Sequence, residues 1–187
     1  MRSPHYFIVR PFNSERYSNN SNGLVLNISV EDHNFTQRIA EVVSNPIGYD
    51  GDVEVGDLII VHHNTFRIQY NNQGFPLESK YHIEDDLFYV EKELAYMIIK
   101  GDGNKIALPP FCFVEPTYIE DKYEGYKENE QICILKYKNR NMTQLNQGDK
   151  VGVRKDSEYE FNIFDEKLYM INQNRIILHL WLDLVKI

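Results

Sequence analysis

The chain of 187 residues contains only two cysteines, Cys112 and Cys133, and a single tryptophan. Two cysteines are too few for a disulfide framework, and this pair lacks the Cys-x-x-Cys spacing of a metal site. Both lie within apolar stretches, which indicates that they pack in the interior and are not reactive thiols. The sequence therefore predicts a reducing compartment, and we expect a cytoplasmic protein.

Long apolar runs are also absent. No segment approaches the ~20 consecutive apolar residues that a membrane-spanning helix needs. At the amino terminus, Pro4 and His5 interrupt the stretch MRSPHYFIVRP where a secretory signal would have its apolar core. We expect no membrane partner and no targeting segment.

Positive charge is scarce, with 20 Lys and Arg against 28 Asp and Glu and a net charge of -8. A nucleic acid or an anionic membrane would require a basic surface, so we expect neither as a partner. Catalytic signatures are missing as well: no nucleophile elbow, phosphate loop, zinc signature or dinucleotide fingerprint occurs. His62 and His63 would point to opposite faces of a strand, which favours a pair beside a turn over a metal site. We expect no enzyme, no cofactor and no metal.

Short runs rich in Val, Ile, Tyr and Phe make up most of the sequence. Gly, Asn and Asp separate these runs, and 13 tyrosines and 10 phenylalanines add to a composition that is typical of strands. One stretch, EDDLFYVEKELAYMI at residues 84–98, has helical character and can be a helix or a single turn between two strands. We predict an all-β fold with no helix beyond a turn or two.

Four motifs recur in the same order in the two halves of the chain. The pairs are VGDLIIV (55–61) with QGDKVGV (147–153), FIVRP (7–11) with CFVEP (112–116), SKYHI (79–83) with SEYEF (157–161), and LFYV (87–90) with KLYM (167–170). The spacing between motifs differs only where loops differ in length, which surface loops tolerate. The repeats predict two tandem small β-barrels, residues 1–104 and 105–187, joined by a tight turn at KGDGN, 100–104.

The order of motifs in the first half resembles that of the GroES-type co-chaperonins. The resemblance covers roughly residues 5–100 and is weaker in the second half. It is carried by YFIVRP (6–11), the polar segment 12–29, QRIAEVVSN (37–45), VEVGDLIIV (53–61) and the stretch 79–98. It implies two GroES-like barrels, the second divergent, in a protein without catalysis that caps a chaperonin ring during ATP-dependent folding.

Within the polar segment, SNGLVLN at residues 21–27 looks like the chaperonin-contacting loop of that family. The resemblance implies that the contact residues are Gly23, Leu24, Val25 and Leu26. The residues fit this role, because Asn13–Asn22 is too polar to bury much surface and is expected to be mobile, while the aliphatic triplet suits an apolar groove. From composition alone, Leu24–Ile28 can also be a buried strand.

Two segments depart from the family pattern. SNPIGYDGD at residues 44–52 is short for the projecting hairpin that roofs many members. The second half has TYIEDKYEGYKENE, 117–130, in place of the contact loop, and this acidic loop lacks a Gly-aliphatic triplet. We expect the second barrel to serve oligomerisation or to line a chamber, and not to grip a chaperonin in the same way.

The carboxyl-terminal stretch IILHLWLDLVKI, 176–187, alternates leucines on one face of a predicted strand. Such a long strand exposes an edge that invites another chain, which predicts an intersubunit element and a ring-shaped homo-oligomer. The two barrels of a chain would lie side by side in one ring or in two tiers.

A second functional class stays open. The same duplicated barrel can belong to a non-enzymatic structural protein, for example a viral head or assembly component. The usage of Asn, Ile, Lys and Tyr suits an AT-rich genome, including those of many phages.

Overall fold

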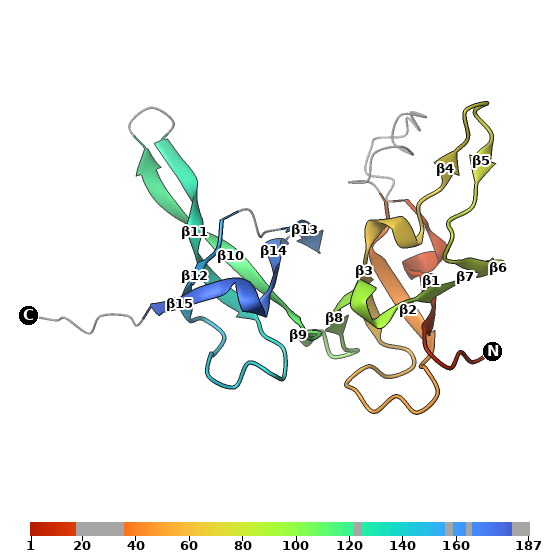
Figure 1. Cartoon of the computed structure of the whole chain (residues 1–187), viewed down its shortest axis with the longest axis horizontal. Helices are drawn as coiled ribbons and strands as arrows, with labels where there is room; N and C mark the ends of the chain where they lie inside the picture. Colours follow the sequence, from red (N-terminus) through yellow and green to blue (C-terminus); the bar gives the residue numbers. More distant parts are fainter. Residues whose placement is uncertain (18–35, 122–124, 156–158, 164–165, 181–187) are drawn as a thin grey trace, which may run out of the picture. The chain divides into compact units, whose positions relative to one another are not determined.

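The computed structural model describes residues 1–17, 36–121, 125–155, 159–163 and 166–180 (Figure 1). Over these ranges the regular elements are antiparallel strands and single 3₁₀ turns, without an α-helix, so the all-β prediction is confirmed. The stretch with helical character consists of two strands separated by the 3₁₀ turn Lys92–Leu94. The alternating apolar residues on either side of that turn pair with neighbouring strands, which outweighs the weak helical signal.

The chain divides into two compact units, Met1–Asn104 and Lys105–Ile187. Among the strands that belong to the first unit, the order in the main sheet is β6-β7-β1-β2-β3-β8. Its strands are β1 (Phe7–Pro11), β2 (Ile39–Ser44), β3 (Leu58–Val61), β6 (His82–Glu84), β7 (Leu87–Val90) and β8 (Ala95–Ile99). A separate hairpin is formed by β4 (Gln69–Tyr70) and β5 (Pro76–Leu77).

The second unit opens with β9 (Lys105–Ala107) and has a sheet of order β13-β14-β10-β11-β12-β15. Its strands are β10 (Phe111–Asp121), β11 (Gly125–Tyr137), β12 (Lys150–Val153), β13 (Tyr159–Ile163), β14 (Glu166–Asn172) and β15 (Ile176–Leu180). Its core gathers apolar side chains from several of these strands, including Cys112, Val114, Cys133, Leu135, Val151 and Ile171. Both cysteines are buried and form no disulfide, as the sequence predicts.

The two sheets have the same strand order when β1 is matched with β10, β2 with β11, β3 with β12, β6 with β13, β7 with β14, and β8 with β15. Two register shifts match too, one of them between Ile60 and Val61 of β3 and between Gly152 and Val153 of β12. The register between the first two strands shifts after Ile8 in one unit and after Phe113 in the other. The repeated motifs thus have a counterpart in the topology.

The register corrects one of the four motif matches. Ile8 pairs with Tyr89, and its equivalent Phe113 pairs with Met170. LFYV at 87–90 therefore corresponds to LYMI at 168–171, and the match with KLYM was wrong by one residue. A slip of one residue exchanges the two faces of a strand, and only the corrected match aligns buried Val90 with buried Ile171.

The two Gly-Asp turns share one geometry. Gly56 and Gly148 have φ of 93° and 90°, in the left-handed region that favours glycine. Each glycine N–H donates to a carbonyl of the neighbouring strand at 2.8 Å, Val42 in the first unit and Leu135 in the second. The ion-pair partners of the two aspartates differ: Asp57 pairs with Lys100 at 2.8 Å, whereas Asp149 lies 3.1 Å from His179.

Three further expectations concern connections. KGDGN is a tight turn, closed by a hydrogen bond from Lys100 N to Asn104 O at 2.9 Å. Residues 45–57, all of them described, contain no strand, so the short roof segment forms no hairpin. Among the described residues neither sheet closes on itself, and closed barrels stay a prediction.

Candidate functional site

The predicted contact residues Gly23, Leu24, Val25 and Leu26 lie outside the described residues. The described chain stops at Tyr17 and resumes at Thr36, and these two residues form an isolated antiparallel bridge. Next to it, Gln37 N donates to Arg16 O at 2.9 Å. The chain therefore leaves and rejoins the described fold at a single place, between β1 and β2.

Arg16 fastens this base to the rest of the first unit. Its Nε donates to the carbonyl of Phe66 at 2.9 Å, and its Nη1 lies 2.9 Å from a carboxylate oxygen of Glu78. The guanidinium carbon lies 5.2 Å from the ring centroid of Phe88, which itself packs edge-on against Phe66. A planar, always charged guanidinium can satisfy these three contacts at once, which lysine could not.

Tyr17 makes the second attachment. Its hydroxyl oxygen accepts a hydrogen bond of 2.7 Å from the backbone N–H of Ile68. Burial raises the pKa of this phenol, although the hydrogen bond from Ile68 acts in the opposite direction. Sequence reasoning missed both Arg16 and Tyr17, because each is held by residues about fifty positions further along the chain. The only local signal is a charged and aromatic pair in a segment otherwise rich in Asn and Ser.

An exposed apolar hairpin begins and ends at the residues that hold this base. The hairpin β4–β5 follows Ile68 and precedes Glu78, and it projects from the first unit (Figure 1). Phe75 is 62% exposed, Leu77 48% and Tyr70 43%. The base of segment 18–35 and this hairpin therefore belong to one edge of the first unit.

The second unit makes the corresponding connection as a strand hairpin. Pairs run from Tyr118 with Glu128 to Asp121 with Gly125, whose φ of 78° allows the reversal. The interpretation of 117–130 as a loop is therefore wrong. The many charged residues gave this segment the composition of a loop. Pairing between the two strands stabilises the hairpin, and local strand propensity does not include that pairing. We call residues 117–121 and 125–131 the arm.

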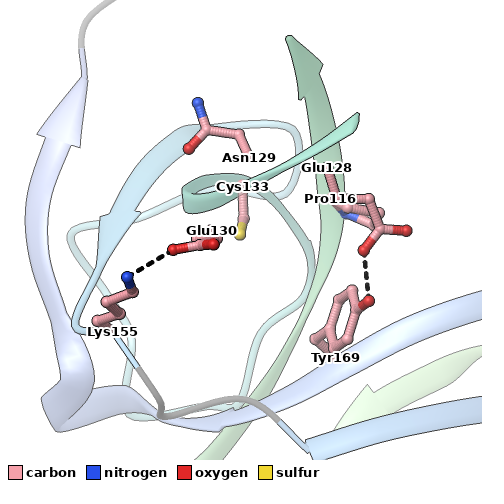
Figure 2. A pocket seen from close by; sticks show the side chains of 7 residues that line it. All are labelled: Pro116, Glu128, Asn129, Glu130, Cys133, Lys155 and Tyr169. Atoms are coloured by element: carbon pink, nitrogen blue, oxygen red, sulfur yellow. Dashed lines mark hydrogen bonds and ion pairs between the residues drawn. The ribbon is translucent and has the colours of Figure 1, made fainter. Parts of the chain in front are cut away.

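A pocket of about 450 Å³ lies at the foot of the arm (Figure 2). It forms where β11 bulges: residues 129–132 stand opposite Thr117 alone. Asn129 stabilises the bulge, because its side-chain oxygen accepts from the backbone N–H groups of Gln131 and Ile132 at 3.0 and 3.1 Å. The lining residues are Pro116, Glu128, Asn129, Glu130, Cys133, Lys155 and Tyr169.

The carboxylates of the pocket already have partners. Lys155 and Tyr169 approach from opposite sides, the former pairing with Glu130 at 2.8 Å and the latter donating its hydroxyl hydrogen to Glu128 (Figure 2). Burial acts to raise the pKa of Glu128, but hydrogen bonds from Lys167 and Tyr169 outweigh it and lower this pKa. Each of these two carboxylates therefore has a partner among the side chains of the second unit.

The histidine pair does not follow the expected strand geometry. β3 ends at Val61, so His62 and His63 enter a 3₁₀ turn and their rings stack with centroids 4.1 Å apart. The expectation of opposite faces was wrong, whereas the preference for a pair beside a turn is confirmed. Within the described ranges, no group of three or more His, Cys, Asp or Glu residues could hold a metal ion.

No protein-family model and no curated protein matches this chain. The GroES-type resemblance therefore rests on the order of the motifs. In the part of the chain that the structure describes, no helix has the length and apolar character needed to cross a membrane.

Proposed function

We propose that this protein is a co-chaperonin, which caps a chaperonin ring in the cytoplasm and assists ATP-dependent folding without chemistry of its own. The observation that carries the proposal is the bridge between Tyr17 and Thr36, which closes segment 18–35 at its base. The segment leaves the sheet between β1 and β2, where the motif order of the GroES family has its contact loop. Gly23, Leu24, Val25 and Leu26 are the proposed contact residues.

The contacts of the base suit such a role. Arg16 and Tyr17 are held by backbone groups of Phe66 and Ile68, so the base is attached to the first unit by contacts outside segment 18–35. A ring-shaped homo-oligomer would present several identical segments. Each could bind weakly while the assembly binds tightly, because every contact after the first is intramolecular.

The test is a triple substitution, Leu24→Ser with Val25→Ser and Leu26→Ser. Burial of each leucine or valine in a chaperonin groove would contribute roughly 1.5 to 3 kcal/mol, so capture by a chaperonin with ATP should be lost. The melting temperature should stay within about 2 °C of the wild type. A matched control replaces the exposed Ile47 and Val55 by Ser and should keep full capture. A large fall in melting temperature for the triple variant would identify Leu24–Ile28 as a core strand and refute the assignment.

The alternative is a non-enzymatic structural protein built on the same duplicated fold. The observation that favours it is β15, the last strand of its sheet, on which Ile177 and Leu178 are 52% and 53% exposed. An exposed apolar edge suits permanent assembly. Such a protein should ignore the chaperonin both with and without ATP, and should sediment as a large assembly on its own.

A further inference from the structure

The arm of the second unit presents a face that combines aromatic and acidic side chains. Tyr118 pairs with Glu128, and Glu120 pairs with Tyr126. Directly opposed residues share a face of an antiparallel pair, as do residues two apart on one strand. These four residues therefore lie on one face, which we call the acidic tyrosine face.

This face is open to solvent although its largest side chains are aromatic. Tyr126 is 77% exposed and Tyr118 is 59% exposed. A single exposed aromatic residue needs no explanation, but two on one face of a protruding hairpin mark an interaction surface. A partner that covers these rings would remove from water the apolar surface that stays exposed after folding.

The backbone of the arm is also available. β14 pairs with β10 only from Phe111 to Val114, and β12 pairs with β11 only from Ile132 to Ile134. Within the described residues, both outer edges of the arm therefore lack a neighbouring strand. Unpaired edges of this kind can accept an extended segment of another chain.

The charge of the arm indicates which side chains such a partner segment would carry. The described strands of the arm carry four acidic residues (Glu120, Asp121, Glu128 and Glu130) and one lysine (Lys127), and Glu128 already pairs with Lys167 at 2.7 Å. The foot of the arm holds the ion pair between Glu130 and Lys155, whose side chains are 70% and 61% exposed. A surface pair of this kind contributes little stability, so a competing cation could replace Lys155 at small cost.

We propose that the acidic tyrosine face binds an extended segment of a partner protein that carries lysine or arginine side chains. The cations would lie over the rings of Tyr118 and Tyr126 and beside Glu120, while the backbone of the segment pairs along the arm. The surface lies at the position that matches segment 18–35 of the first unit. The proposal does not depend on the proposed function, because it concerns a different surface in the other unit.

The test uses the full chain and two fluorescein-labelled dodecapeptides, one alternating lysine with threonine and one alternating glutamate with threonine. Fluorescence anisotropy should show binding of the lysine peptide only. Its affinity should fall at least ~10-fold between 50 mM and 500 mM salt, because exposed charges are screened. Equal binding of both peptides, or no binding of the lysine peptide, would overturn the proposal.

Substitutions then locate the site. Tyr118→Ser with Tyr126→Ser should weaken binding of the lysine peptide by about 10-fold, and Glu120→Lys by a similar factor. Tyr118→Phe with Tyr126→Phe keeps both rings and should stay within about twofold of the wild type. Matched controls in the first unit, Tyr70→Ser and Glu93→Lys, should bind like the wild type. If the controls weaken binding as much as the arm variants, the site is elsewhere and the proposal is wrong.

A second measurement does not depend on how the variants fold. Amide hydrogen exchange of the wild-type chain should slow along 117–121 and 125–131 when the lysine peptide is added, because edge pairing protects backbone N–H groups. Protection confined to the first unit would overturn the proposal even if every variant behaved as expected.

Discussion

The two units share one strand order but make the connection between their first two strands in different ways. In the first unit the chain leaves the described fold at Tyr17 and returns beside it at Thr36. In the second unit β10 and β11 continue as the arm, and Gly125 is the first residue of β11. This connection is therefore the variable part of the fold. The strand order, two of the register shifts and the Gly-Asp turns are retained, and the connection is where new binding surface can be added.

The largest expected loss of stability comes from removing the side chain against which the base of segment 18–35 packs. Phe88 is fully buried, packs against Phe66 and lies beneath Arg16. Phe88→Ala should lower the free energy of unfolding by about 3–5 kcal/mol, because it leaves a cavity. Denaturant unfolding measures the loss, and hydrogen exchange should localise it to residues 1–104. Equal loosening of both units would show that they do not unfold separately.

The next largest loss of stability is expected at the Gly-Asp turns, where the two units should differ. Asp57 is buried and its carboxylate binds both Lys100 and the backbone N–H of Glu54, whereas the side chain of Asp149 is 22% exposed. Asp57→Ala should lower the free energy of unfolding by about 2–3 kcal/mol, because it leaves buried hydrogen-bonding groups without a partner. Asp149→Ala should lower it by about 1 kcal/mol. The two variants are compared by denaturant midpoint at one pH. A larger loss of stability for Asp149→Ala than for Asp57→Ala would mean that the contact with His179 stabilises the fold more than the contact with Lys100.

A smaller effect should follow from Tyr17→Phe. The change leaves the ring in place but removes the oxygen that accepts from Ile68 N, so we expect a loss of about 1 kcal/mol in the free energy of unfolding. If the base positions the proposed contact residues, chaperonin capture should weaken severalfold as well. The control is Tyr6→Phe, at a position 38% exposed, which should change neither stability nor capture. Unchanged capture by the Tyr17 variant would mean that the base does not position the segment.

The smallest effect concerns acid stability at the foot of the arm. Hydrogen bonds from Lys167 and Tyr169 outweigh burial and lower the pKa of Glu128 from its ordinary value of 4.5. A carboxylate with a lowered pKa stabilises the fold above pH 4.5, and this contribution is lost as the pH falls through its folded pKa. The difference in stability between the wild type and Glu128→Gln should be below about 1 kcal/mol at pH 7 and vanish in acid. A difference that grows in acid would contradict the assignment.

Local patterns predicted much of the fold. The β-rich runs became strands, the Gly-Asp turns share their geometry, and the stretch 84–98 is two strands around a short turn. The predictions were wrong where pairing between strands determines the structure. The register of β14 was wrong by one residue, and residues 117–130 looked like a loop because their charges hide a hairpin. The predicted contact residues lie outside the described part and stay a prediction.

Local sequence is enough to locate the strands and the turns between them, because alternation of apolar residues and the need for glycine at positive φ act over a few residues. Tertiary contacts set which strands neighbour one another, where β11 bulges, and what holds the two ends of segment 18–35 together. Those outcomes depend on partners far apart in the chain, such as Arg16 and Phe66, which are 50 residues apart. Such contacts form only after the chain between them has been closed into a loop, at a cost in entropy that no local window of sequence contains.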